Sequence, residues 1–218
     1  MEYDDARNVL LRHAGIAENY YEDGFLGCLR PYSGIKPNNF HTVIESVLSV
    51  GNTFSTADSI ERPIVYAIWH MTTTARNQGT EDDGMLVRNK LISADDRKRL
   101  RQWVEILESM MLCLLHGRES YDSILQYCEY VVEHGWGPNF RFFVPLLSAA
   151  IENDDCGDGL QAYCEAIISL GPKAIETKAS LERARLRKWE WYEPHERCTA
   201  ESLGFIDKAL LAIENTQD

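Results

Sequence analysis

The sequence lacks the short motifs that mark the common enzymes and metal sites. It contains no H-E-x-x-H motif, no G-x-S-x-G motif and no adjacent His-Asp pair, and its six cysteines include no C-x-x-C pair. Cys113 and His116 share the face of a predicted helix, but a structural zinc ion needs two further ligands, and no second close pair supplies them. The sequence therefore predicts no metal and no cofactor, and it favours a protein that is not an enzyme.

Basic residues are few, and long apolar runs are missing. Lys and Arg total 22 against 34 Asp and Glu, and the formal net charge is -12. This charge repels nucleic acid and anionic lipid and favours a cationic partner. No apolar run approaches the roughly 18 residues that cross a bilayer, the charged first residues do not resemble a secretory signal, and widely spaced cysteines are typical of a reducing compartment. We expect a cytoplasmic protein that binds neither membrane nor nucleic acid.

Strand signals are almost absent, because the chain shows no sustained period-two alternation and no paired runs around Asn-Gly or Asp-Gly turns. Helix signals are frequent. The clearest helix begins at Ser93, where Asp96 completes a capping box, and it ends at Gly117 after apolar residues spaced by three and four. The other helices are predicted at about 4–22, from Asn38 or Asn39 to Gly51, from Asp58 or Ser59 onward, and at about 121–134, 142–152, 159–170, 173–191 and 200–214.

These patterns predict one all-α domain over 1–218, built as a compact bundle of about eight or nine helices. The triplet Tyr-Cys-Glu at 127–129 recurs 36 residues later at 163–165, and Gly135 likewise recurs as Gly171. This spacing suits a helical-hairpin repeat. A helical-hairpin array in the C-terminal half and a compact orthogonal bundle are the alternatives that the sequence leaves open.

The loop GTEDDG at 79–84 carries three consecutive acids, Glu81, Asp82 and Asp83. Its glycines have the spacing of a phosphate-binding loop, but the Lys-Ser/Thr pair that should follow is missing, and three carboxylates would repel phosphate. The pattern indicates a solvated acidic loop, which would act in binding as an acidic contact surface.

An enzymatic alternative centres on His70. Together with Arg76 and the acids of the 81–83 loop, it could line a polar cleft for acid-base chemistry. The helix that carries it has its apolar side at Ile64, Val65, Ile68 and Trp69.

A second acidic stretch nearly fits the calcium-loop pattern from Asp154 to Glu165. Cys156 occupies the third position, where a hard cation needs an oxygen ligand, and the chain has no sister loop. The alternative is a helix start, with Asp158 as the cap and Asp155 near the positive end of the helix dipole. We favour this alternative.

Two basic segments interrupt the acidic composition. The first, at 97–101, follows two acids in a helix and is expected to pair along that helix as a solvated face. The second, at 183–197, interleaves basic residues with Trp189 and Trp191. It is compatible with single-stranded nucleic acid, with a protein interface, or with one tryptophan in the core and the rest covering a helix end.

The sequence as a whole is best interpreted as an acidic protein-binding module. Its concrete form would be a cytoplasmic inhibitor, such as an immunity or antitoxin-like protein, that engages a basic partner protein by charge complementarity. The alternatives are an enzyme with a site near His70 and a helical scaffold subunit. The residues predicted to contact the partner are Glu81, Asp82, Asp83, Asp154, Asp155, Asp158, Trp189 and Trp191.

Overall fold

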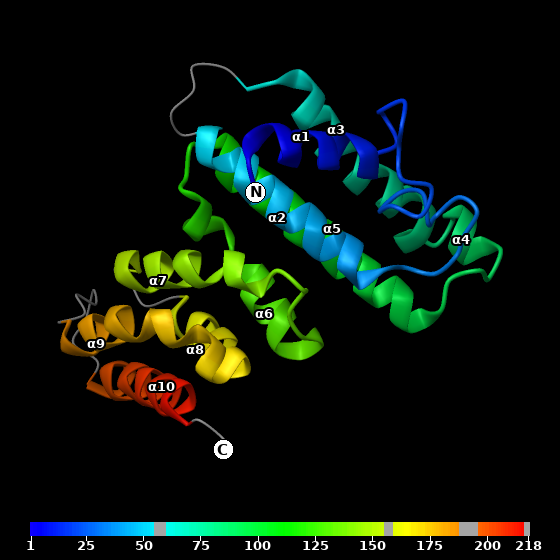
Figure 1. Ribbon diagram of the computed structural model, residues 1–218. Helices are drawn as coiled ribbons and strands as arrows, with labels where there is room; N and C mark the ends of the chain where they lie inside the picture. Colours follow the sequence, from blue (N-terminus) through cyan, green and yellow to red (C-terminus); the bar gives the residue numbers. More distant parts are fainter. Residues whose placement is uncertain (55–59, 155–158, 188–195, 216–218) are drawn as a thin grey trace. The chain divides into compact units, whose positions relative to one another are not determined.

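Helices form the regular structure in the part of the chain that is described. The structure, a computed structural model, describes residues 1–54, 60–154, 159–187 and 196–215 (Figure 1). Within these ranges no strand occurs, and the only β-type pairing is an isolated bridge between Leu29 and Tyr32. The prediction of an all-α fold is confirmed.

The chain divides into two compact units, Met1–Ser123 and Ile124–Asp218. The first holds α1 (Tyr3–His13), α2 (Pro37–Phe54), α3 (Arg62–Ala75), the π-helical turn η1 (Arg76–Thr80), α4 (Met85–Arg88), α5 (Ala94–Leu115) and the 3-10 turn η2 (Ser120–Ser123). The second holds α6 (Leu125–His134), η3 (Phe140–Phe142), α7 (Val144–Asn153), α8 (Leu160–Leu170), η4 (Gly171–Thr177), α9 (Lys178–Leu186) and α10 (Glu196–Glu214), of which η3 and η4 are 3-10 helices. A single domain over 1–218 stays a prediction.

The core of the first unit lies among four helices. α1 packs on α2 and α3, and α5 packs on the same two helices. At its centre the rings of Phe40 and Trp103 stack with centroids 4.8 Å apart and planes 4° from parallel. Both side chains are buried, so this aromatic pair fixes α5 against α2.

The α5 helix forms as its local signals predict. Its N-cap, Ser93, accepts a hydrogen bond from the amide of Asp96 at 3.0 Å. Just beyond the helix, Gly117 adopts a positive φ of 71°, a conformation that glycine enters without steric cost. The Ser93 cap, the apolar stripe and the stop are read correctly from the sequence. The Asp96 side chain, expected to complete a capping box, accepts a hydrogen bond from the Tyr32 hydroxyl at 2.9 Å.

Three predicted boundaries in the first unit are wrong. The helix expected from Asp58 or Ser59 onward begins at Arg62, with Glu61 as its N-cap. The first helix ends at His13, not near residue 22, because Gly15 turns the chain with a φ of 69°. The second helix does not end at Gly51 but continues to Phe54. A Cβ at Gly51 would lie 2.7 Å from Leu114 of α5. Glycine therefore serves close helix packing here, and it does not stop the helix.

The second unit has two successive segments of the same construction. α6 ends at Gly135 with a φ of 85°, and α8 ends at Gly171 with a φ of 57°. After each glycine come a 3-10 turn and then another helix, α7 or α9 (Figure 1). α6 packs on α8 and α8 on α10, while α7 packs on α9. In a helical hairpin the two successive helices pack on each other, but among the described residues α6 with α7 and α8 with α9 are not among the packed pairs. The helical-hairpin array therefore stays a prediction.

The predicted helix boundaries in this part of the chain need three corrections. The last helix, expected at about 200–214, begins at Glu196. The helix expected at 121–134 begins at Leu125, because residues 120–123 form the 3-10 turn η2. The helix expected at 173–191 is shorter, because 171–177 form η4 and α9 extends only from Lys178 to Leu186. Pro172 lies in the first turn of η4.

Candidate functional site

The acidic loop at 81–83 follows a continuous helical segment. α3 passes without a break into the π-helical turn η1, and the loop leads from η1 to α4. The side chains of Glu81, Asp82 and Asp83 are all exposed, whereas Gln78, Gly79 and Thr80 just before them are buried. A buried turn thus places three consecutive carboxylates at the surface.

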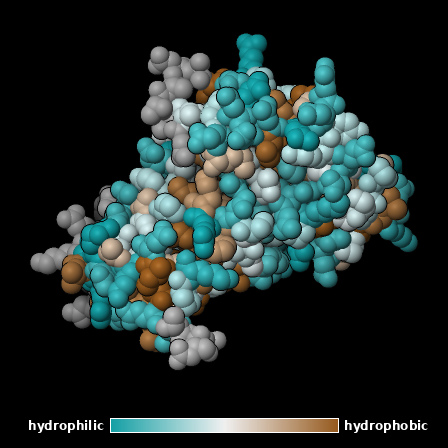
Figure 2. All heavy atoms as spheres, in the orientation of Figure 1, coloured by the Kyte–Doolittle hydropathy of each residue, from teal (hydrophilic) through white to brown (hydrophobic). Residues whose placement is uncertain are grey.

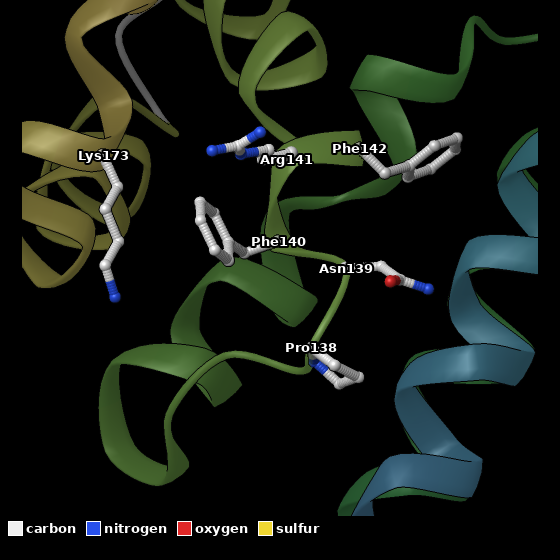
Figure 3. A pocket seen from close by; sticks show the side chains of 6 residues that line it. All are labelled: Pro138, Asn139, Phe140, Arg141, Phe142 and Lys173. Carbon is white, nitrogen blue, oxygen red and sulfur yellow. The ribbon is translucent and has the colours of Figure 1, made fainter.

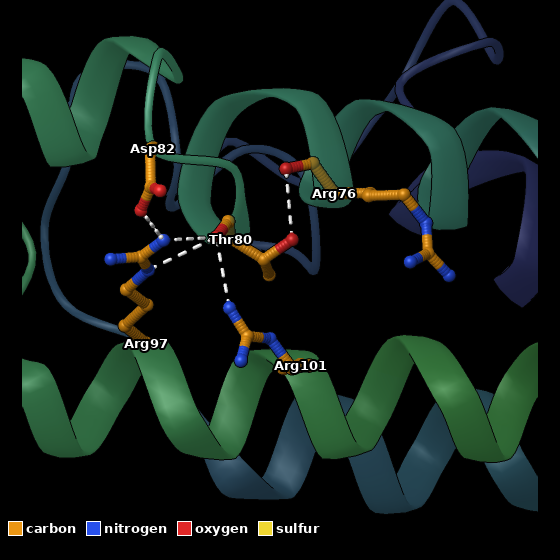
Figure 4. A network of polar contacts seen from close by, with 5 residues as sticks. All are labelled: Arg76, Thr80, Asp82, Arg97 and Arg101. Atoms are coloured by element: carbon orange, nitrogen blue, oxygen red, sulfur yellow. Dashed lines mark hydrogen bonds and ion pairs between the residues drawn. The ribbon is translucent and has the colours of Figure 1, made fainter.

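Two arginines of α5 hold this turn in place (Figure 4). Arg97 donates hydrogen bonds from Nε and Nη2 to the carbonyl oxygen of Thr80, at 3.0 and 2.6 Å. Arg101 donates a third from Nη2 to the same oxygen, at 3.2 Å. Arg97 Nη2 also pairs with Asp82 Oδ1 at 2.6 Å. Both arginines were expected to pair along their own helix, and that expectation is wrong, because they cross to the loop instead.

The glycines of the loop have a packing role. A Cβ on Gly84 would lie 2.7 Å from the carbonyl oxygen of Gln78 and 2.8 Å from that of Asn77, which are backbone atoms of η1. A Cβ on Gly79 would lie 2.5 Å from Leu100 of α5. The spacing that resembles a phosphate loop therefore reflects close packing of the turn against itself and against α5.

The loop remains available for binding although one of its acids is paired. The hydrogen bond and the positive charge of Arg97 lower the pKa of Asp82. The Asp82 side chain is nevertheless 96% exposed. Arg97 therefore orients this carboxylate without covering it, and Glu81 and Asp83 flank it at the surface.

An aromatic surface lies on the exposed side of α3. Tyr66 is 49% exposed and Trp69 is 52% exposed. Together with Ile60, Arg62 and Val65 they line a shallow hollow of about 410 Å³. Trp69 was expected on the apolar side of its helix with Ile64, Val65 and Ile68, and this is wrong, because the buried face of α3 consists of Ile64, Ala67, Ile68, Met71, Thr72 and Ala75.

The structure does not assemble the cluster suggested for acid-base chemistry. The His70 ring stacks on Tyr66, with centroids 5.6 Å apart, and its Nδ1 lies 3.2 Å from the hydroxyl of Thr74. Arg76 forms an ion pair with Glu108 of α5, and in Figure 4 it points away from the other two arginines. Among the described residues, no hydrogen bond or ion pair joins His70 to the carboxylates of the loop.

The second predicted contact region is described only in part. Asp154 Oδ2 accepts a hydrogen bond from the amide of Gly159 at 3.2 Å, just before α8 begins. Glu165 Oε1 accepts one from Gln161 at 2.9 Å. In the ranges that the structure describes, no group of His, Cys, Asp and Glu side chains is arranged to hold a metal ion. Asp155, Asp158, Trp189 and Trp191 lie outside the described residues.

Sequence reasoning missed the two features that distinguish this region, the arginine contacts to Thr80 and the exposure of Tyr66 and Trp69. The arginine contacts span 17 and 21 residues, so local spacing carried no signal for them. A signal for the aromatic face did exist, because Arg62, Tyr66 and Trp69 follow one another at helical intervals of four and three.

Comparisons with known proteins give no relative for this chain: no family model matches, and neither does any curated protein or solved structure. Among the described helices, none combines the length and the apolar character that a bilayer crossing demands.

Proposed function

We propose that this chain is a protein-binding module whose partner presents a basic surface. Its docking surface comprises the exposed side of α3 and the loop that follows η1, namely Arg62, Tyr66, Trp69, Glu81, Asp82 and Asp83. The observation that carries the proposal is the anchored loop, in which three guanidinium hydrogen bonds fix the carbonyl of Thr80, directly before three exposed acidic residues.

The anchoring supports binding because a preordered loop loses little conformational entropy when a partner docks. η1 is buried, and Arg97 and Arg101 fix its last residue to α5. Glu81 lies 12 positions after Trp69, which corresponds to roughly 18 Å along a helical axis. The aromatic and acidic parts are therefore far enough apart to contact different parts of one partner.

The chemistry of the surface also supports a protein partner. Tyr, Trp and Arg are the residues that most often dominate binding energy in protein interfaces, and the hollow on α3 combines all three. In Figure 2 hydrophilic residues cover most of the visible face, and the hydrophobic groups between them are small. The chain carries a net charge of -12, which favours a partner of opposite sign.

The concrete form that we propose is an inhibitor, such as an immunity or antitoxin-like protein. Enzymes that act on nucleic acid bind polyanions and therefore present basic surfaces, and an acidic inhibitor matches such a surface. Asp154, Asp155, Asp158, Trp189 and Trp191 remain proposed as a second contact region. We further propose a cytoplasmic location, which the free thiols of Cys28, Cys113, Cys128 and Cys164 support.

The experiment that tests this proposal compares three baits in affinity capture from lysate of the native source. The first is the unchanged chain. The second neutralises the loop by Glu81→Gln, Asp82→Asn and Asp83→Asn. The third neutralises three exposed acids outside the docking surface, by Glu18→Gln, Glu119→Gln and Asp122→Asn. Both triple variants change the net charge by the same amount, so a difference between them reports the position of the charge.

We expect a basic protein to be retained by the first and third baits in stoichiometric amount and to be lost from the second. Retention should weaken as salt is raised, because exposed charges are screened. Equal retention by all three baits, or no retained protein at low salt, would contradict the proposal.

A further inference from the structure

A second hollow lies within the second unit, in the segment that follows α6. Its volume is about 540 Å³, and it is lined by Pro138, Asn139, Phe140, Arg141, Phe142 and Lys173. In Figure 3 the ring of Phe140 lies between Arg141 and Lys173, while Asn139 and Phe142 point to the other side of the segment. The volume is within the range of small-molecule sites, roughly 300–1,000 Å³.

The charge of this hollow is opposite to that of the chain. Two of the six lining residues are cations and none is an acid. The Lys173 ammonium lies over the Phe140 ring, 5.4 Å from its centroid, which is a cation-π distance. A basic hollow in an acidic protein therefore has a local electrostatic character that net charge does not reveal.

Neither cation of the hollow is neutralised by a described carboxylate. Within the described ranges, the side chains of Arg141 and Lys173 form no hydrogen bond or ion pair. Other basic residues of the same unit do so: Lys178 pairs with Glu214 at 2.7 Å, and Arg185 pairs with Asp207 at 3.0 Å. Arg141 and Lys173 are thus both available to pair with an incoming anion.

We propose that this hollow binds the phosphate group of a small phosphate monoester. Such a group carries a charge of about -1.5 to -2 at neutral pH, which two cations can balance. The guanidinium of Arg141 offers a planar fork of donors for two phosphate oxygens, and Lys173 adds a point charge. The Phe140 ring between them gives an apolar wall for the rest of the ligand. All of these residues belong to the second unit, so the proposal does not depend on the docking surface.

Isothermal titration of the full chain at low ionic strength tests the site with two phosphate probes, adenosine 5′-monophosphate and glycerol 3-phosphate. Adenosine and glycerol are the matched probes without phosphate. We expect heat of binding from the phosphate probes and none from their uncharged counterparts. A larger affinity for the nucleotide would identify a nucleotide as the natural source of the phosphate, and equal affinities would identify a non-aromatic phosphate ester.

Variants locate the binding. Arg141→Gln and Lys173→Gln should each weaken phosphate binding by about tenfold to a hundredfold, as expected for loss of hydrogen bonds to a charged group. Lys208→Gln is the matched control, because Lys208 lies over Phe205 at 5.6 Å in α10 and reproduces the Lys-Phe contact outside the hollow. Both altered residues of the hollow are exposed, so circular dichroism should show an unchanged fold.

Three results would overturn the proposal. They are equal affinity for adenosine and its monophosphate, undiminished affinity of the Arg141→Gln/Lys173→Gln double variant, and the absence of binding heat with either phosphate at millimolar concentration.

Discussion

Two buried histidines should make the first unit sensitive to mild acid. His13 and His41 are only 5% and 8% exposed. Burial lowers the pKa of each to about 4. For His13, Asp23 opposes this shift and Arg12 adds to it, and its Nδ1 accepts the amide hydrogen of Phe25 at 3.0 Å. Both side chains are therefore neutral in the folded protein throughout the weakly acidic range.

The sign and size of the effect follow from proton linkage. A histidine in the unfolded chain has a pKa of about 6.5, so between pH 6.5 and 4 the unfolded state binds a proton that the folded state does not. Stability must fall as the pH falls through this window. Each histidine lowers the free energy of unfolding by about 1.4 kcal/mol per pH unit within this window. From pH 7 to 5 the free energy of unfolding falls by about 2 kcal/mol for each histidine and about 4 kcal/mol for both.

The assay is urea unfolding at pH 7 and at pH 5. Hydrogen exchange, measured by mass spectrometry on peptides of the first unit, monitors the unfolding. Hydrogen bonds from Arg7 and Tyr3 lower the pKa of Glu61, and those from Ser180 and Arg183 lower the pKa of Glu152. Such carboxylates protonate mainly below this interval. His13→Asn keeps an acceptor for the Phe25 amide and should halve the pH-dependent loss.

A control and a refuting result complete this test. His116→Gln should leave the loss unchanged, because His116 is exposed in the folded protein. A loss below about 1 kcal/mol between pH 7 and 5 would refute the reasoning, since it would mean that both imidazoles accept protons within the fold.

Three further predictions concern glycine packing, the anchoring by Arg97, and the different roles of Trp103 and Trp69. Gly84→Ala should lower the free energy of unfolding by about 1–3 kcal/mol, because the added Cβ would meet backbone oxygens. Gly204→Ala in α10 should raise it by about 0.5–1 kcal/mol, because a Cβ there meets nothing within 4 Å. Urea unfolding measures both changes. Arg97→Met should lower the free energy of unfolding by about 1.5–3 kcal/mol through loss of the hydrogen bonds to Thr80. It should also speed hydrogen exchange at residues 76–84. Unchanged exchange there would contradict the anchoring role of Arg97. Trp103→Ala should lower the free energy of unfolding by about 3–5 kcal/mol, because Trp103 is buried. Trp69→Ala should change it by less than about 0.5 kcal/mol and still abolish capture of the partner. Retained capture would exclude Trp69 from the docking surface.

Where signals are local, the sequence alone predicts the structure well. The start and end of α5 depend on Ser93 and Gly117, each of which acts within one helical turn. The all-α class follows from apolar spacing along the whole chain in the same way. The stops at Gly135 and Gly171 were also readable, because a glycine after a helical stripe usually adopts a positive φ.

Where the outcome depends on distant packing, the sequence is ambiguous. Gly51 has the same local pattern as a helix stop, and only the approach of Leu114 shows that the helix continues through it. Trp69 borders the apolar side of α3, and helical periodicity alone does not decide which apolar residues a neighbouring helix covers.

The sequence predicted the exposed acids of the candidate site but not the contacts that anchor them. The exposed acids at 81–83 are evident from composition, and the structure leaves them exposed. Their anchoring by Arg97 and Arg101 depends on how α5 lies against η1, a tertiary contact that a basic run in a helix does not announce. The same run with a different helix placement would have been a solvated face.

The measurement that tests the central claim most directly is the association rate of the captured partner as a function of ionic strength, for the unchanged chain and both triple variants. If the 81–83 loop steers association, neutralising it should slow association at low salt by about tenfold or more and flatten the salt dependence. The variant of Glu18, Glu119 and Asp122 should keep a rate close to that of the unchanged chain. Equal rates and equal salt dependence for the two variants would contradict the claim that this loop is the docking surface.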